Sequence, residues 1–175
     1  MNQKYFEENI LPFKNKLYRI ALRITANAPE AEDIVQDVMM RMWQLREQWN
    51  TIDNKEAYCC MMSRNIALSR ISLKDNEKGR PDSAEISIKA DSTPSDELET
   101  KERMGMLREF IGRLPGHEKA VMELRDIEGM PYKDIAFTLN INEGQVKVNL
   151  YRARQKIKEY FHRTDSYINT GKKVI

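Results

Sequence analysis

The chain has 175 residues, a formal net charge of +2, and 32% charged against 41% hydrophobic side chains. This length suits one ordinary domain or two small helical ones, and only 7 glycines and 6 prolines argue against a strand-rich fold, which needs more turn residues. The adjacent cysteines, Cys59 and Cys60, fit neither a disulfide framework nor a zinc site, so we interpret them as packing residues.

No membrane insertion is expected. Charges are threaded through the N-terminal sequence, where a signal peptide would have an apolar core, and no run of about 18 apolar residues occurs. The sequence therefore predicts a cytoplasmic protein.

Three helices are predicted in the N-terminal part. Apolar residues recur at steps of three and four over residues 6–24 and again over 31–49, the spacing of one helix face. Pro29 fits the first helical position of the second stretch. A third helix is predicted over residues 55–73, and together the three form a compact unit over residues 1–73.

The stretch 74–93 is predicted to be a flexible linker. It is poor in large apolar residues, contains Gly79 and Pro81, and shows no sustained period. Residues 74–104 carry 6 basic and 9 acidic side chains, whereas residues 105–175 carry 13 basic and 9 acidic ones. The basic excess therefore lies at the C-terminal end.

A four-helix unit is predicted over residues 94–163. Helical spacing resumes after Thr93 and Pro94 and ends at Pro115, and a second helix covers residues 117–127 and stops at Gly129. The residues after 163 are predicted to be a frayed C-terminal tail, 164–175.

The last two helices of this unit are predicted to form a helix-turn-helix. A short helix breaks at Asn140, and Asn142 with Gln145 three residues later matches a capping box that starts the next helix. A break of three residues gives the helix crossing of this motif. The buried stripe of the final helix is expected to be Val146, Leu150, Ala153 and Ile157.

The opposite face of that helix carries the candidates for DNA contact. Residues 144–163 hold six basic side chains and a single acidic one, Glu159. Recognition helices place N-terminal residues on base edges and long basic side chains on phosphates. We expect base reading by Gln145, Val148 and Arg152, backbone positioning by Lys147, Arg154, Lys156 and Lys158, and further contacts from Asn149 and Tyr151.

Three segments, in this order, resemble the extracytoplasmic-function (ECF, group 4) RNA polymerase sigma factors of the sigma-70 family. AEDIVQDVMMRMW (31–43) is similar to the part of region 2 that docks on the polymerase, SRNIALSR (63–70) to the part that captures melted minus-10 DNA, and the segment 114–157 to region 4, which reads the minus-35 element. The resemblance implies an all-α fold of two small domains, region 2 and region 4.

The resemblance also assigns residues. Polymerase contacts fall on Asp33, Gln36, Asp37 and Met40, and minus-10 contacts on Arg64, Asn65 and Arg70. Gln145 stands where a small residue is usual, and Val148 and Asn149 replace the usual Ser-Arg-like pair. An apolar Val148 suits a thymine methyl and favours A·T-containing steps.

The expected function is promoter recognition and transcription initiation by a DNA-binding protein that is not an enzyme and needs no cofactor or metal. The expected partners are core RNA polymerase, promoter DNA and an anti-sigma factor, and the free protein is expected to be a monomer. Asp33 and Asp37 share a helix face, but no third ligand accompanies them, so a solvated face or a partner patch is the simpler interpretation. The alternative function is a helix-turn-helix regulator that acts without polymerase, although such proteins usually dimerise and no zipper is evident.

Overall fold

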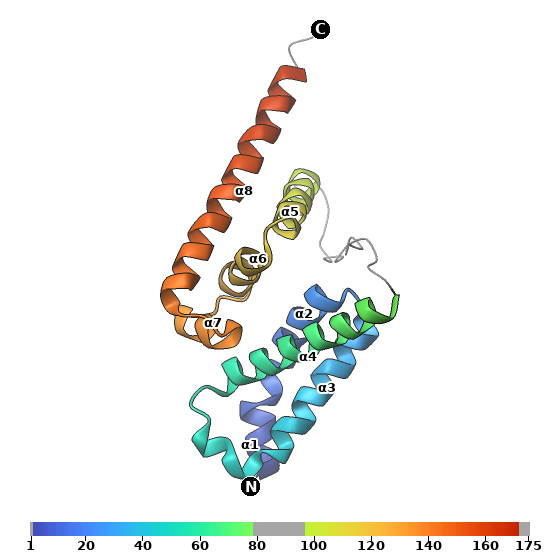
Figure 1. The fold of residues 1–175 in the computed structure, drawn as a ribbon, viewed down its shortest axis with the longest axis vertical. Helices are drawn as coiled ribbons and strands as arrows, with labels where there is room; N and C mark the ends of the chain where they lie inside the picture. Colours follow the sequence, from blue (N-terminus) through green and yellow to red (C-terminus); the bar gives the residue numbers. More distant parts are fainter. Residues whose placement is uncertain (1, 79–96, 172–175) are drawn as a thin grey trace. The chain divides into compact units, whose positions relative to one another are not determined.

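The computed structural model describes residues 2–78 and 97–171 (Figure 1). All regular secondary structure in these two ranges is helical, which confirms the all-α prediction. The described residues divide into two compact units, one holding α1 to α4 and the other α5, α6, η3, most of α7 and α8. Most of the predicted linker lies outside the described residues.

The N-terminal unit is built around three helices that all pack on one another: α2, α3 and α4 (Figure 1). Its elements in chain order are α1 (Asn2–Asn9), η1 (Leu11–Phe13), α2 (Lys14–Thr25), α3 (Ala28–Gln44), η2 (Arg46–Thr51) and α4 (Lys55–Lys78). Helix α4 continues past Leu73, where the apolar pattern predicted its end.

The single helix predicted over residues 6–24 is interrupted. Pro12 lies in the short 3-10 turn η1, because proline has no backbone N–H and its ring clashes with the preceding helical turn. The apolar stripe nevertheless stays on one side, with Ile10 and Leu17 both fully buried. The second predicted stretch is also divided, since α3 ends at Gln44 and Trp49 lies in η2, where its indole Nε1 donates to the Met42 carbonyl at 2.9 Å.

A tight corner joins α2 to α3. Ala26 adopts a left-handed conformation (φ 56°), and its N–H donates to the Leu22 carbonyl, which closes α2. Asn27 then caps α3, its Oδ1 accepting from the Glu30 N–H at 3.0 Å. Pro29 lies in the first turn of α3, as its position in the sequence predicts.

Small side chains let the three helices approach closely. Ala21, Ala31 and Ala67 are fully buried, one from each helix, around Ile34. The buried Ser63 hydroxyl of α4 donates to the Leu17 carbonyl of α2 at 3.1 Å, so this buried polar group is satisfied. Cys59 and Cys60 are buried free thiols, and burial raises the pKa of Cys59 to about 12, which keeps that thiol protonated and suits a packing role.

The C-terminal unit contains the helix-turn-helix. Its elements are α5 (Glu97–Gly112), α6 (Gly116–Met122), the π turn η3 (Glu123–Ile127), α7 (Tyr132–Leu139) and α8 (Glu143–Gly171). The helix predicted over residues 117–127 therefore begins as α and ends as π, with the Glu128 N–H donating to the Glu123 carbonyl. It stops at Gly129, whose φ of 69° is strained for side-chain-bearing residues.

The turn of the motif uses two successive end structures. Asn140 is left-handed (φ 54°), its N–H donates to the Phe137 carbonyl, and the Ile141 N–H donates to the Ala136 carbonyl, the pattern of a Schellman motif. The capping box follows at once: the Asn142 N–H donates to Gln145 Oε1 (3.0 Å) and the Gln145 N–H donates to Asn142 Oδ1 (2.8 Å). The predicted capping box is thus confirmed.

Aromatic side chains extend the core along α8 beyond the helix-turn-helix. Phe110 of α5 stacks on Tyr160 (centroids 5.0 Å apart) and meets Phe161 edge-on (5.3 Å). These contacts join the cluster that includes Leu114 and Ile157. Helix α8 is long because its apolar stripe has α5 as a partner here, and it continues to Gly171 through most of the predicted tail.

The capping box predicts a measurable stability difference. Asn142→Ala removes the acceptor for the Gln145 N–H and should lower the free energy of unfolding of the C-terminal unit by about 1 kcal/mol. Asn142→Ser keeps a capping oxygen and should stay close to the wild type. Urea unfolding of the full chain, followed by circular dichroism, measures both. Equal losses in the two variants would contradict a capping role.

Candidate nucleic-acid and polymerase interfaces

The N-terminal half of α8 presents an exposed face opposite the core. The four residues of the predicted stripe (Val146, Leu150, Ala153 and Ile157) are buried, which confirms the predicted orientation of the helix. On the other side, Val148 is 48% exposed and Tyr151 66% exposed. Lys147, Arg152 and Lys158 are also exposed, and none of the three forms an ion pair with any residue in the described ranges.

Two of the predicted DNA-contacting side chains are engaged within the helix itself. Gln145 Oε1 accepts from the Asn142 backbone N–H as part of the capping box. Asn149 Nδ2 donates to the Gln145 carbonyl at 2.8 Å, and this side chain is only partly exposed. Both amides already have partners before any DNA is bound.

Two of the predicted phosphate-binding cations are paired with carboxylates of the same unit. Arg154 forms two hydrogen bonds to Asp126, from Nη2 at 2.6 Å and from Nε at 3.2 Å, and this bonding raises the pKa of Arg154. Lys156 Nζ donates to both oxygens of Glu118, at 2.8 and 3.0 Å. Glu118 is buried, so its charge depends on this partner.

These pairs fasten α8 to the preceding helices. Glu118 lies on α6 and Asp126 on η3, so the two ion pairs join the recognition helix to both elements. Glu118 and Asp126 were not among the functional residues predicted from the sequence. No local pattern marks them, because their partners lie 38 and 28 residues away.

In the N-terminal unit, α3 and α4 are connected by a ladder of charges. Arg70 Nη2 donates to Asp37 Oδ2 at 2.7 Å, and Arg70 Nη1 lies 4.0 Å from Asp33 Oδ2. Lys74 Nζ reaches Glu30 Oε2 at 2.5 Å. The structure therefore brings Arg70, a predicted minus-10 residue, together with two predicted polymerase contacts.

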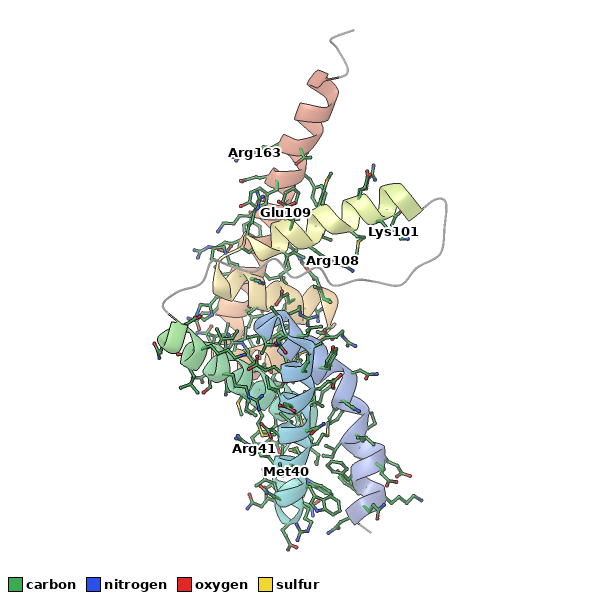
Figure 2. All side chains as sticks on the ribbon, turned by 90° about the vertical axis from the view of Figure 1, so that its right-hand side faces the viewer. Met40, Arg41, Lys101, Arg108, Glu109 and Arg163 are labelled. Carbon is green, nitrogen blue, oxygen red and sulfur yellow. The ribbon has the colours of Figure 1, made fainter. Side chains whose placement is uncertain are left out.

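The other predicted residues of this unit differ in accessibility. Asn65 is exposed on α4, whereas Arg64 is half-buried, and desolvation lowers the pKa of its guanidinium, which remains charged. On α3, Asp33, Gln36 and Met40 are exposed and share a helix face with the half-buried Asp37. Met40, labelled in Figure 2, is 55% exposed, while Met42 is fully buried, as its core position predicts.

Two domain models of one family match the chain, in the order of the two units. "Sigma-70 region 2" matches residues 10–76 and "Sigma-70, region 4" matches residues 104–157. The fold and the helix-turn-helix thus define a sigma-70 protein with one domain of each kind.

Relatives that match most of the chain show which kind of sigma-70 protein it is. The ECF RNA polymerase sigma factor SigL of Mycobacterium tuberculosis is 30% identical over 140 residues, which cover 78% of this chain and 77% of SigL. SigW of Bacillus subtilis is 25% identical over 90% of this chain and 89% of its own length, whereas the match to SigE of Mycolicibacterium smegmatis covers 63% of that protein. The chain belongs to the family of ECF RNA polymerase sigma factors.

Solved structures support the same fold. The sigma factor RpoE from Bartonella quintana, solved with the anti-sigma factor NepR, aligns with a TM-score of 0.73 at 21% identity over 91% of this chain and 98% of its own. CnrH, solved with the cytosolic domain of CnrY, aligns with a TM-score of 0.64 at 17% identity over 92% and 90%. In the described parts of this chain, no helix is both long and apolar enough to cross a membrane.

The ion pairs predict that cations of α8 differ in their effect on DNA binding. Lys158→Ala should flatten the dependence of log K on log salt concentration by about 1, because an unpaired cation that meets a phosphate releases one counterion. Arg154→Ala should change this slope much less, because Asp126 already compensates the charge. Anisotropy titrations of a labelled duplex over a range of salt measure both slopes, and equal changes would show that the Asp126 pair opens on DNA.

Proposed function

We propose that this chain is a group 4 sigma factor whose N-terminal unit binds core RNA polymerase and melted minus-10 DNA and whose C-terminal unit binds the minus-35 duplex. The observation that carries the proposal is the helix-turn-helix of a region 4 domain, in which Lys147, Arg152 and Lys158 are exposed on α8 and paired with no residue of the described part of the chain. Catalysis then belongs to the polymerase, and the protein acts as a monomer in the cytoplasm.

On the minus-35 side, the nine predicted residues have two kinds of role. The exposed, unengaged ones, Lys147, Val148, Tyr151, Arg152 and Lys158, contact DNA directly. Arg154 and Lys156 orient α8 through Asp126 and Glu118, and Gln145 and Asn149 set its first turns. Base reading therefore falls mainly on Val148, Tyr151 and Arg152.

On the minus-10 side, Asn65 is the accessible polar reader of an unstacked base on α4. Arg70 contributes a phosphate contact without leaving Asp37, because a guanidinium has five N–H donors and the short bond to Asp37 uses one of them. Arg64 is half-buried, so it contributes to the minus-10 surface mainly by packing beneath the exposed side chains.

On the polymerase side, Asp33, Gln36, Asp37 and Met40 form the docking face of α3. An exposed methionine beside acidic and amide groups has the mixed composition of a protein interface. An anti-sigma factor that covers this face would keep the protein from its polymerase, and a relative of the same fold was solved with such a factor.

Transcription with purified core polymerase tests the function. With this protein present, a library of random upstream sequences should give transcripts whose templates share two spaced boxes, and core polymerase alone should not. Stimulation without shared boxes, or none at all with an active core, would contradict the proposal. Sequence-specific DNA binding without polymerase would instead support the helix-turn-helix regulator.

The docking face predicts a separable defect. Asp33→Ala combined with Gln36→Ala should weaken the association with core polymerase at least tenfold, because it removes a charge and an amide from the centre of the face. Pull-down or fluorescence titration with labelled core measures this. Glu47→Ala is a matched control, because it removes an exposed carboxylate that lies in η2, outside the α3 face. Unchanged affinity in the double variant would exclude this docking assignment.

A further inference from the structure

The exposed face of α8 is more apolar at its centre than its cationic flanks suggest. Val148 and Tyr151, three residues apart, share one side of the helix, 48% and 66% exposed. Removing apolar surface from water is favourable by about 25 cal/mol per Å², so burying these two side chains against a partner would stabilise the complex. A partner that binds this face of α8 therefore contacts these two apolar side chains.

The amide side chains that flank Val148 in the first turns of α8 offer little free hydrogen-bonding capacity. Gln145 Oε1 and Asn149 Nδ2 both bond to the backbone of the first turns of α8. Glutamine and asparagine are the side chains that read adenine with paired hydrogen bonds, and here each would first have to break a bond it already makes. Van der Waals contact thus has a larger share of base reading than on a polar recognition helix.

We propose that Val148 and Tyr151 form an apolar strip that reads thymine methyl groups in the major groove of the minus-35 duplex. In unmodified DNA the C5 methyl of thymine is the one apolar group on the base edges of that groove. This inference rests on the proposed function, since it names the bases that region 4 recognises.

The spacing of the two side chains fits neighbouring base pairs. Three residues of α-helix rise about 4.5 Å, and successive base pairs in B-DNA lie about 3.4 Å apart. Two adjacent A·T pairs, with thymines on either strand, therefore place their methyls within reach of the strip.

The charges around the strip favour DNA as its occupant. Lys147 lies next to Val148 in sequence, Arg152 next to Tyr151, and Lys158 follows along the helix, all exposed and none paired within the described ranges. Cations that border an apolar strip match a groove whose walls are phosphates and whose floor carries methyl groups.

Replacing thymine by deoxyuridine tests the strip, because it removes the methyl group and keeps every hydrogen bond. The minus-35 box is first identified by transcription from the random library, with the full chain and core polymerase. Holoenzyme binding is then measured on promoters that carry deoxyuridine at single positions of the box. We expect about a fourfold loss at one or two adjacent positions, the usual worth of one methyl-sized apolar contact. Deoxyuridine upstream of the box is the control.

Variants assign each methyl to its reader. Val148→Ser removes both γ-methyl groups and introduces a hydroxyl, and it should abolish the loss at one position. Tyr151→Ala should abolish the loss at the neighbouring one. Both positions are exposed, so neither change disturbs the core. Lys158→Ala should weaken binding to thymine and deoxyuridine promoters equally.

The outcomes separate failure of the apolar strip from failure of the proposed sigma function. No deoxyuridine penalty anywhere in the box, or a penalty that persists in both variants, overturns the strip while leaving the sigma function intact. Weaker polymerase binding by Val148→Ser, with unchanged duplex binding, would make the strip a protein contact and also overturn it. Failure of the full chain to direct transcription would overturn the proposed function, and this inference with it.

Discussion

The turn between α7 and α8 is the constraint on which the orientation of the exposed face of α8 depends. The Schellman bonds end α7 at Asn140, and the reciprocal bonds of Asn142 and Gln145 begin α8 two residues later. Because every residue along a helix turns by about 100°, fixing the first turn also fixes which later side chains face outward. Val148, Tyr151 and Arg152 are exposed as a result, while Val146 and Leu150 face the core.

Two carboxylates of the preceding helices also fix the position of α8. Glu118 and Asp126 bind Lys156 and Arg154, so α8 is held by the earlier helices at positions three to four turns beyond its start. Because Glu118 is buried and Lys156 bonds both of its oxygens, removing Lys156 would leave a buried carboxylate without its cation. The charge of a recognition helix is therefore shared between holding the helix and attracting the duplex.

In the N-terminal unit, ion pairs likewise connect two helices, α3 and α4. Asp37 of α3, the helix proposed to face polymerase, holds Arg70 of α4, the helix proposed to face DNA. Glu30, two turns earlier on α3, holds Lys74, one turn later on α4. A change at either surface thus alters the electrostatics of the other. In a protein proposed to join polymerase and melted DNA, this ladder is a direct physical link between the two interfaces.

The sequence by itself determined the helices, their buried stripes and the turn of the helix-turn-helix, because these follow from residues three and four positions apart. The capping box and the burial of Ala153 and Ile157 were predictable for that reason. Local periodicity also misled, since a continuous stripe over residues 6–24 concealed the break that Pro12 makes.

The packing of the helices determines which basic side chains are paired with carboxylates. Six basic residues look alike in the stretch 144–163, yet Arg154 and Lys156 are paired with carboxylates 28 and 38 residues away, and Arg70 with one 33 residues away. No local spacing encodes such pairs, since they arise when helices far apart in the chain pack side by side. The structure also decided that Gln145 and Asn149 form hydrogen bonds in the first turns of α8, beside the exposed Val148 and Tyr151.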